Sequence, residues 1–288
     1  MMATVLAPAD IARAATLAAA LEASAPKPGN VGPGHDFGDM GYEDFLRSAV
    51  AIGPALGDAG ARGVGTTVLR AIQDTRRRVA ANTNLGIVLL FAPLARAAAT
   101  GEGELRSRLR RVLSALTVGD AEAVYAAIRL ANPGGLGEVA EQDVRQAPTV
   151  TLRQAMALAA ARDSIASEYG TDYAITFETG MPALARALEA GSSLRTAATE
   201  AFLAILARVP DTLIARRCGD AAAQRVSRVA ADVLAAGPAG SPARTRALTE
   251  LDASLRDPAN AMNPGTTADL TAATLFVRLL EQHLSEQE

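Results

Sequence analysis

The chain has 288 residues, of which 49% are hydrophobic and 3% aromatic, and its formal net charge is -3. This length can bury a full core as one large domain, whereas the slightly acidic balance and the lack of Trp exclude a basic or aromatic surface for nucleic acid. The single cysteine, Cys218, excludes an internal disulfide and a cysteine-based metal site, so a reducing cytoplasm is the expected setting.

Helical periodicity runs through the whole chain, and no alternating run of β-branched residues predicts a strand. We therefore expect an all-α fold, with residues 1–288 in one multi-helix domain. The most apolar run, 85–95, contains Pro93 and is too short to span a bilayer, so no membrane association is expected. In chain order, helices are expected over 9–23, from 42 to about 56, over 64–79, from 85, and over 104–116, 120–130, 152–168, 173–190, 194–208, 221–235 and 243–255, with a last helix announced by 263–270.

Residues 25–48 form the longest break in this helical pattern, because prolines and glycines exclude a helix from most of the stretch. Lys27, the only lysine among 28 Lys and Arg residues, lies here, together with His35, Asp36 and Asp39. A loop of this kind brings backbone N–H groups close to a ligand. The alternative is a helix connector with solvated charges, but a structureless connector of this length is more often functional.

The asparagines occur at breaks or expected helix starts, as Asn30, Asn82, Asn84, Asn132, Asn260 and Asn263. Each one alone is typical of a cap or a left-handed turn. Together they indicate helix N-termini, where free N–H groups and the helix dipole form anion sites. Because the sequence has no Walker A run and no dinucleotide fingerprint, a phosphate site has to be built from several helix ends.

Five short blocks fall in these same breaks. In chain order they are Lys-Pro-Gly-Asn-Val at 27–31; His-Asp at 35–36 with Phe-Leu-Arg-Ser at 45–48; Asn-Thr-Asn-Leu-Gly at 82–86; Pro-Asp-Thr-Leu-Ile at 210–214, followed by Arg216 and Arg217; and Asn-Pro-Gly at 263–265, followed by Ala-Asp-Leu at 268–270. In this order the blocks resemble the triphosphoribosyl-dephospho-CoA synthase family.

The resemblance implies an all-α cytoplasmic transferase that attacks C1 of the ATP ribose, releases adenine and joins the triphosphoribosyl group to the 2′-hydroxyl of 3′-dephospho-CoA through an α linkage. The product is the precursor of a lyase prosthetic group. Such a reaction needs a carboxylate near C1, a donor for the departing adenine and a base for the acceptor proton.

On this resemblance we expect three kinds of site residue. Catalysis is assigned to His35 as the base, with Asp36 and Asp39 directed to Mg²⁺, which enters as Mg-ATP. Lys27 and Arg216 or Arg217 are assigned to the triphosphate, and Asn82, Asn84 and Asp269 to ribose or base. Asn30 and Asp211 complete the predicted substrate-binding set.

The block at 82–86 departs from the better-known members, which carry Asn-Thr-His-Lys-Gly where this chain has Asn-Thr-Asn-Leu-Gly. The loss of a His-Lys pair at a helix start points to altered complementarity for a polyphosphate or to another acceptor. A pterin-like acceptor, with (phospho)ribosyl transfer in tetrahydromethanopterin-type cofactor biosynthesis, is therefore the alternative to a CoA-like acceptor. A hydrolase variant, a non-enzymatic helical scaffold and a homodimeric assembly also remain open.

Overall fold

Fourteen α-helices make up almost all of the regular structure in the computed structural model, which describes residues 5–38, 40–133 and 141–286. An isolated β-bridge between Gly32 and His35 is the only β pairing among those residues. The helical content confirms the all-α prediction.

The first part of the chain supplies eight α-helices and one short 3-10 helix. These are α1 (Pro8–Ser24), α2 (Tyr42–Gly57), η1 (Asp58–Ala61), α3 (Val64–Arg76), α4 (Leu85–Ala99), α5 (Leu105–Ser114), α6 (Val118–Ala131), α7 (Leu152–Ala159) and α8 (Ser164–Thr171). The second part begins with a π-helical turn, η2 (Thr176–Gly180), and continues with α9 (Met181–Glu189), α10 (Leu194–Arg208), α11 (Thr212–Cys218), α12 (Asp220–Ala235), α13 (Pro242–Leu255) and α14 (Gly265–Ser285).

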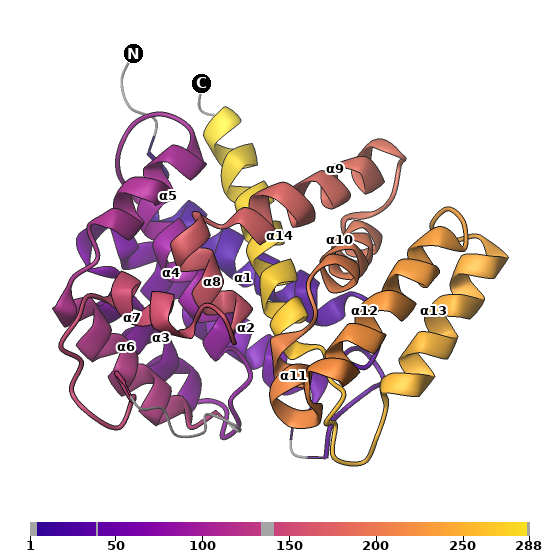
Figure 1. Ribbon diagram of the computed structural model, residues 1–288. Coiled ribbons are helices and arrows are strands. Elements are labelled where there is room, and N and C mark those ends of the chain that lie inside the picture. The colour runs from indigo at the N-terminus through magenta and orange to yellow at the C-terminus, as the bar shows by residue number, and fades with distance from the viewer. Residues whose placement is uncertain (1–4, 39, 134–140, 287–288) are drawn as a thin grey trace.

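The long final helix α14 lies between these two groups of helices (Figure 1, yellow), with α1 to α8 on one side and α10 to α13 on the other. Both hydrophobic clusters of the core draw residues from it: the larger takes Leu270 and Phe276, and the smaller takes Ala268. Phe276 stacks on Phe91 of α4 with the ring centroids 4.3 Å apart. Because the larger cluster joins these two helices, their N-terminal ends are held in a fixed relation.

Two buried tyrosines of the α8 region hold helix α4 where proline interrupts its hydrogen bonding. Pro93 has no N–H, so the carbonyl of Leu89 lacks its usual partner four residues on. The hydroxyl of Tyr169 donates to that carbonyl at 2.7 Å, and the hydroxyl of Tyr173 donates to the carbonyl of Leu90 at 2.9 Å. The two hydroxyl groups thereby hydrogen-bond carbonyl oxygens of this buried helix, including the one that Pro93 leaves without its usual donor.

The structure corrects three local predictions. One helix was expected over 152–168, but the chain breaks after α7, and Asp163 caps a new helix, α8, by accepting from the N–H groups of Ile165 and Ala166. Helix α11 was not predicted. The sequence spacing of Thr266 and Asp269 predicts a capping box at the start of α14, but Pro264 is the N-cap residue and makes no side-chain cap hydrogen bond.

Candidate functional site

A cleft of about 660 Å³ opens where several helices begin, and this is in the usual size range of a small-molecule site. The N-terminal ends of α4, α8 and α14 border it, as do residues of the loop before α2 and of α11. Its polar lining comprises Glu22, Asn30, Arg76, Asn82, Thr83, Asn84, Tyr125, Asn132, Glu141, Gln142, Asp143, Arg162, Asp163, Arg216, Arg217, Asn260, Asn263, Thr266 and Asp269.

Helix α4 presents its N-terminus to this cleft, where the N–H of Leu85 donates to Asn82 Oδ1 at 3.2 Å. Asn84 is its N-cap residue, yet its side chain accepts no hydrogen bond from the first turn. The side-chain Nδ2 instead donates to Thr75 Oγ1 at 3.1 Å, and the buried Oδ1 has no partner. A buried carbonyl oxygen without a donor costs free energy in the empty protein. It is therefore a candidate acceptor for a ligand hydroxyl or amino group.

Helix α14 begins in the same way on the other wall. Asn263 lies just before it, and its Oδ1 is also buried without a partner. The first-turn N–H of Thr267 is satisfied by Asp211 at 2.7 Å, but no side chain serves as the N-cap. Two long helices thus direct the positive ends of their dipoles toward one cleft, an arrangement that favours an anionic ligand.

Asp269, in the second turn of α14, packs directly against the first turn of α4. A Cβ atom added to Gly86 would overlap Asp269 Oδ2, so only glycine permits this approach. Burial raises the pKa of Asp269 well above its usual range, and the nearby carboxylates of Glu22, Asp211 and Asp163 raise it further. Arg216 opposes this shift. The half-buried Asp269 therefore holds a proton more readily than an ordinary aspartate.

Glu22 reaches the cleft from the last turn of α1 and is only 2% exposed. Its Oε1 lies 3.1 Å from the Nζ of Lys27, whose side chain is fully buried. The ammonium also donates to the backbone carbonyls of Glu22 and Ala25. Desolvation raises the pKa of Glu22, while the charge and hydrogen bond of Lys27 lower it. The only lysine of the chain therefore supports a carboxylate of the cleft.

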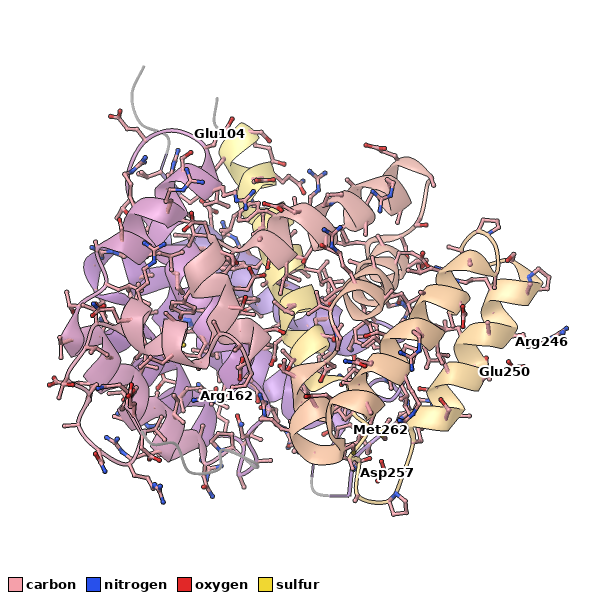
Figure 2. All side chains as sticks on the ribbon, viewed as in Figure 1. Glu104, Arg162, Arg246, Glu250, Asp257 and Met262 are labelled. Atoms are coloured by element: carbon pink, nitrogen blue, oxygen red, sulfur yellow. The ribbon has the colours of Figure 1, made fainter. Side chains whose placement is uncertain are left out.

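Arginines supply the positive charge of the cleft. Arg216 pairs with Asp163 at 2.9 Å, whereas Arg217 donates to the carbonyl of Asn260 at 2.9 Å. Arg76 and Arg162 contact backbone carbonyls of their own segments, and among the described residues neither forms an ion pair with an acidic side chain. Figure 2 labels Arg162 on the α1–α8 side of the molecule. These guanidinium groups can hydrogen-bond phosphate oxygens.

The structure brings six of the predicted site residues together at this cleft: Asn30, Asn82, Asn84, Arg216, Arg217 and Asp269. It places others elsewhere. His35 is exposed and pairs through its backbone with Gly32, and it does not line the cleft. Asp36 is also exposed and accepts from the N–H of Tyr42 at 2.7 Å, which makes it a cap for α2. Asp39 lies outside the described residues.

Lys27 and Asp211 also have structural positions behind the cleft wall. Lys27 is buried against Glu22, so its predicted direct contact with a triphosphate is replaced by an ion pair inside the protein. Asp211 accepts from Leu213 and Ile214 with one oxygen and from Thr267 with the other. Both of its oxygens are occupied, so it ties α11 to α14 and has no oxygen left for a ligand.

The predicted site residues did not include several polar residues of the cleft, among them Glu22, Arg76, Asp163 and Asn263. Glu22, Arg76 and Asp163 lie in predicted helices, where charged residues are typical of solvated faces. Asn263 was grouped with the asparagines at helix starts but was assigned no contact with the substrate. The one available signal for Glu22 was the isolated lysine five residues later, because a single lysine needs an acceptor.

A protein-held metal site at Asp36 does not fit this geometry, since its carboxylate caps α2 away from the cleft. Within the described ranges, no three His, Cys, Asp or Glu side chains gather closely enough to hold a metal ion. Within the same ranges, no helix is long and apolar enough to cross a bilayer.

The fold and cleft define a class: an all-α protein whose ligand site is assembled from helix N-termini, arginines and amides. Within this class, the chain belongs to the ATP:dephospho-CoA triphosphoribosyl transferase family, whose model matches residues 8–288. This finding confirms the resemblance drawn from the five blocks.

Two curated relatives and one solved structure carry related names. Over 104 residues the chain is 40% identical to a Pseudomonas syringae pv. tomato protein (36% of this chain, 35% of the relative), and over 97 residues 39% identical to a Klebsiella pneumoniae protein (34% of each). Both are assigned as 2-(5″-triphosphoribosyl)-3′-dephosphocoenzyme-A synthases. Each match spans about a third of the relative's length. A crystal structure from Archaeoglobus fulgidus, assigned as a triphosphoribosyl-dephospho-CoA synthase, superposes with a TM-score of 0.63 at 28% identity, covering 82% of this chain and 98% of that one.

Proposed function

We propose that this protein is a transferase that moves the 5-triphosphoribosyl group of ATP to the 2′-hydroxyl of 3′-dephospho-CoA, with release of adenine. The observation that carries the proposal is the cleft at the starts of α4 and α14, in a chain that belongs to the corresponding family. Helix N-termini and guanidinium groups are complementary to a triphosphate. Buried amide oxygens are complementary to ribose hydroxyls and to an adenine amino group.

In this proposal different residues of the cleft bind different parts of ATP. Arg217 and Arg76 face the triphosphate, whose Mg²⁺ enters with the nucleotide as Mg-ATP and needs few protein ligands. Asn84 and Asn263 accept from hydroxyl or amino groups of the nucleoside, which satisfies their unpaired oxygens. The acceptor, a CoA-like molecule, enters the same cleft so that its hydroxyl reaches C1 of the ribose.

Incubation of the purified full chain with ATP, Mg²⁺ and 3′-dephospho-CoA tests the proposal. The expected result is free adenine in equal amount to a CoA product whose mass has increased by the triphosphoribosyl group. Intact ATP and unchanged 3′-dephospho-CoA, from a folded protein, would contradict it. Product from a pterin-type acceptor in parallel reactions would then redirect the proposal to that acceptor class.

A matched pair of arginine variants tests whether the cleft holds the triphosphate. Arg217→Gln removes a cation that lines the cleft, whereas Arg78→Gln removes an exposed cation of the α3 terminus that does not. We expect the KM for ATP to rise about tenfold in the first variant, as for loss of a charge-assisted hydrogen bond. The second variant should keep the wild-type KM. Equal KM values for ATP in the two variants would contradict binding of the triphosphate at this wall of the cleft.

A further inference from the structure

Two carboxylates line the cleft from helices that are far apart in the sequence. Glu22 reaches it from the end of α1, and Asp269 reaches it from the second turn of α14. They interact electrostatically, since the charge of Glu22 contributes to the raised pKa of Asp269. The placement of two carboxyl groups around one ligand cavity is the arrangement that enzymes use to cleave glycosidic bonds.

The charges around the two groups differ in sign. Burial raises the pKa of both carboxyl groups, but at Glu22 the ammonium of Lys27, 3.1 Å from its Oε1, opposes that rise. Asp269 faces three acidic side chains, from α1 and from the caps of α8 and α11, namely Glu22, Asp163 and Asp211, and one arginine of α11, Arg216. A pair of carboxyl groups whose neighbouring charges differ in this way can divide the acid and base roles.

The ion pair of Lys27 is costly as a purely structural feature. Burial of both charges carries a desolvation penalty that a hydrophobic pair would avoid. Lys27 has no exposed side-chain surface and Glu22 has 3%. Glu22 nevertheless lines the cleft, so its carboxyl group can contact a ligand there.

We infer that Glu22 and Asp269 form the catalytic carboxylate pair, with Glu22 as the ionised base that also faces the positive charge developing at C1, and Asp269 as the acid that protonates the departing adenine. Lys27 is then a positioning residue that keeps Glu22 ionised. This inference rests on the proposed function, because it assigns the groups that would perform that reaction.

The step is balanced without a further reactant. The bond from C1 of the ribose to N9 of adenine breaks, its electron pair stays on adenine, and the proton of Asp269 moves to a ring nitrogen. The 2′-hydroxyl oxygen of the acceptor bonds to C1, and its proton moves to Glu22. A β-nucleotide that gives an α linkage is inverted at C1, so the acid and the base act on opposite faces of the sugar.

A substrate with a modified base separates the two roles. ATP methylated at N7 carries a cationic base that leaves without protonation. Asp269→Asn should therefore lower kcat about 100-fold on ATP but less than about tenfold on N7-methyl-ATP, because only the first needs an acid. Glu22→Gln should lower kcat about 100-fold on both substrates. Glu178→Gln, which changes an exposed carboxylate that does not line the cleft, is the matched control and should retain wild-type kcat on both.

Other outcomes overturn the inference. An equal loss on both substrates in Asp269→Asn would remove its role as the acid, and a loss of less than about threefold in Glu22→Gln would remove its role as the base. Circular dichroism and thermal unfolding of each variant identify a folding defect. If wild-type protein itself released no adenine from ATP and 3′-dephospho-CoA, the proposed function would fail, which is a separate result.

Lys27 variants test the positioning role by a readout that packing alone would not move. Lys27→Met removes the cation facing Glu22, so the acidic limb of the kcat/KM profile should move to higher pH, whereas Lys27→Arg should restore it toward the wild-type position. A loss of thermal stability with an unmoved acidic limb would make Lys27 merely structural. If Lys27→Met does not fold, the Lys27→Arg profile and the Glu22→Gln kinetics still decide the assignment.

Discussion

The loop before α2 and the wall formed by the starts of α4 and α14 are both rich in polar residues, yet they differ in how those residues are satisfied. In the loop, His35 is exposed to solvent and Asp36 caps a helix. In the wall, Asn84 and Asn263 each bury an oxygen that has no partner. Solvent or the protein itself completes the first set, whereas a ligand or a bound water has to supply the donor for the second.

This difference separates rare residues from functional ones. A chain with a single lysine and two histidines draws attention to the loop that holds Lys27 and His35. Rarity, however, says nothing about burial or hydrogen bonding. An unpartnered buried oxygen is the more informative sign, because its cost in the free protein is recovered when a donor arrives.

The largest expected effect comes from adding a methyl group at the contact between α4 and α14. Gly86→Ala places a methyl group where Asp269 Oδ2 lies, so the carboxylate must move. We expect kcat to fall about 100-fold, as for loss of a general acid, with a stability cost of about 1–3 kcal/mol from overpacking. Steady-state adenine release and thermal unfolding measure the two effects.

Gly170→Ala in α8 is the matched control, because an added Cβ there meets nothing within 4 Å. Its stability should be unchanged or higher, since alanine is a better helix former than glycine. Wild-type kcat in Gly86→Ala would mean that the position of Asp269 does not matter for turnover, which would contradict a catalytic role of the wall.

Glu168 is a buried carboxylate whose hydrogen-bond partners are all internal, in contrast to the carboxylates that line the cleft. Thr176 and Ile175 donate to it, at 2.8 Å from the N–H of Thr176, and it does not line the cleft. Desolvation raises its pKa to about 7 from 4.5, against the hydrogen bonds of Thr176 and Ile175 and the charge of Arg106. The folded state therefore binds a proton more tightly than the unfolded state.

The sign of the pH dependence follows from this shift. Stability from Glu168 is present below about pH 4.5 and is lost as the pH rises through about 7, an effect of up to about 3 kcal/mol. Urea unfolding at pH 5 and pH 8 should show a less stable protein at pH 8, and Glu168→Gln should make that difference smaller. An unchanged difference in the variant would assign the pH dependence to other groups.

Asn263→Ala tests the unsatisfied wall directly, with a smaller effect. Removal of the unpartnered oxygen should leave the free protein equally stable or about 1 kcal/mol more stable, since no internal hydrogen bond of Oδ1 is lost. Binding of ATP should weaken about five- to tenfold because a ligand donor loses its acceptor. Calorimetric titration measures the affinity, and a lower stability with unchanged affinity would make Asn263 a structural residue.

Asp36→Ala gives the smallest expected effect, and it tests the loop. Loss of the hydrogen bond to the N–H of Tyr42 should cost about 1 kcal/mol of stability, as for other helix caps. His35→Ala should change neither stability nor turnover appreciably, because its side chain is exposed and does not line the cleft. A fall in kcat in either variant, at full folding, would return the catalytic role to the loop.

Much of the fold could be predicted from periodicity, because the 3.6-residue repeat of apolar positions follows directly from helix burial. The break between α7 and α8 was not predicted, because the helical pattern of the sequence continues through Asp163, whose Oδ1 caps α8 while its Oδ2 pairs with Arg216. The α14 start was located correctly, but its cap was not, because Thr266 lies inside the first turn, where its hydroxyl accepts from Thr212 at 3.1 Å.

Part of the site could be predicted, because helix starts can be recognised in the sequence. Asn82 and Asn84 mark a helix start in the sequence, and that start does reach the cleft. Glu22 could not be found, because a glutamate in an alanine-rich helix looks like a solvent-facing charge until the fold buries it. Sequence shows where helices begin, but only the structure shows which helix ends meet.

Amide hydrogen exchange with and without Mg-ATP tests the central claim most directly, because it reports where the nucleotide binds. In the absence of an acceptor, ATP should slow exchange of the amides at the starts of α4 and α14, around residues 84–88 and 265–269, and leave residues 34–36 unchanged. Protection confined to residues 34–36, with none at the two helix starts, would contradict the claim that the helix-start cleft is the nucleotide site.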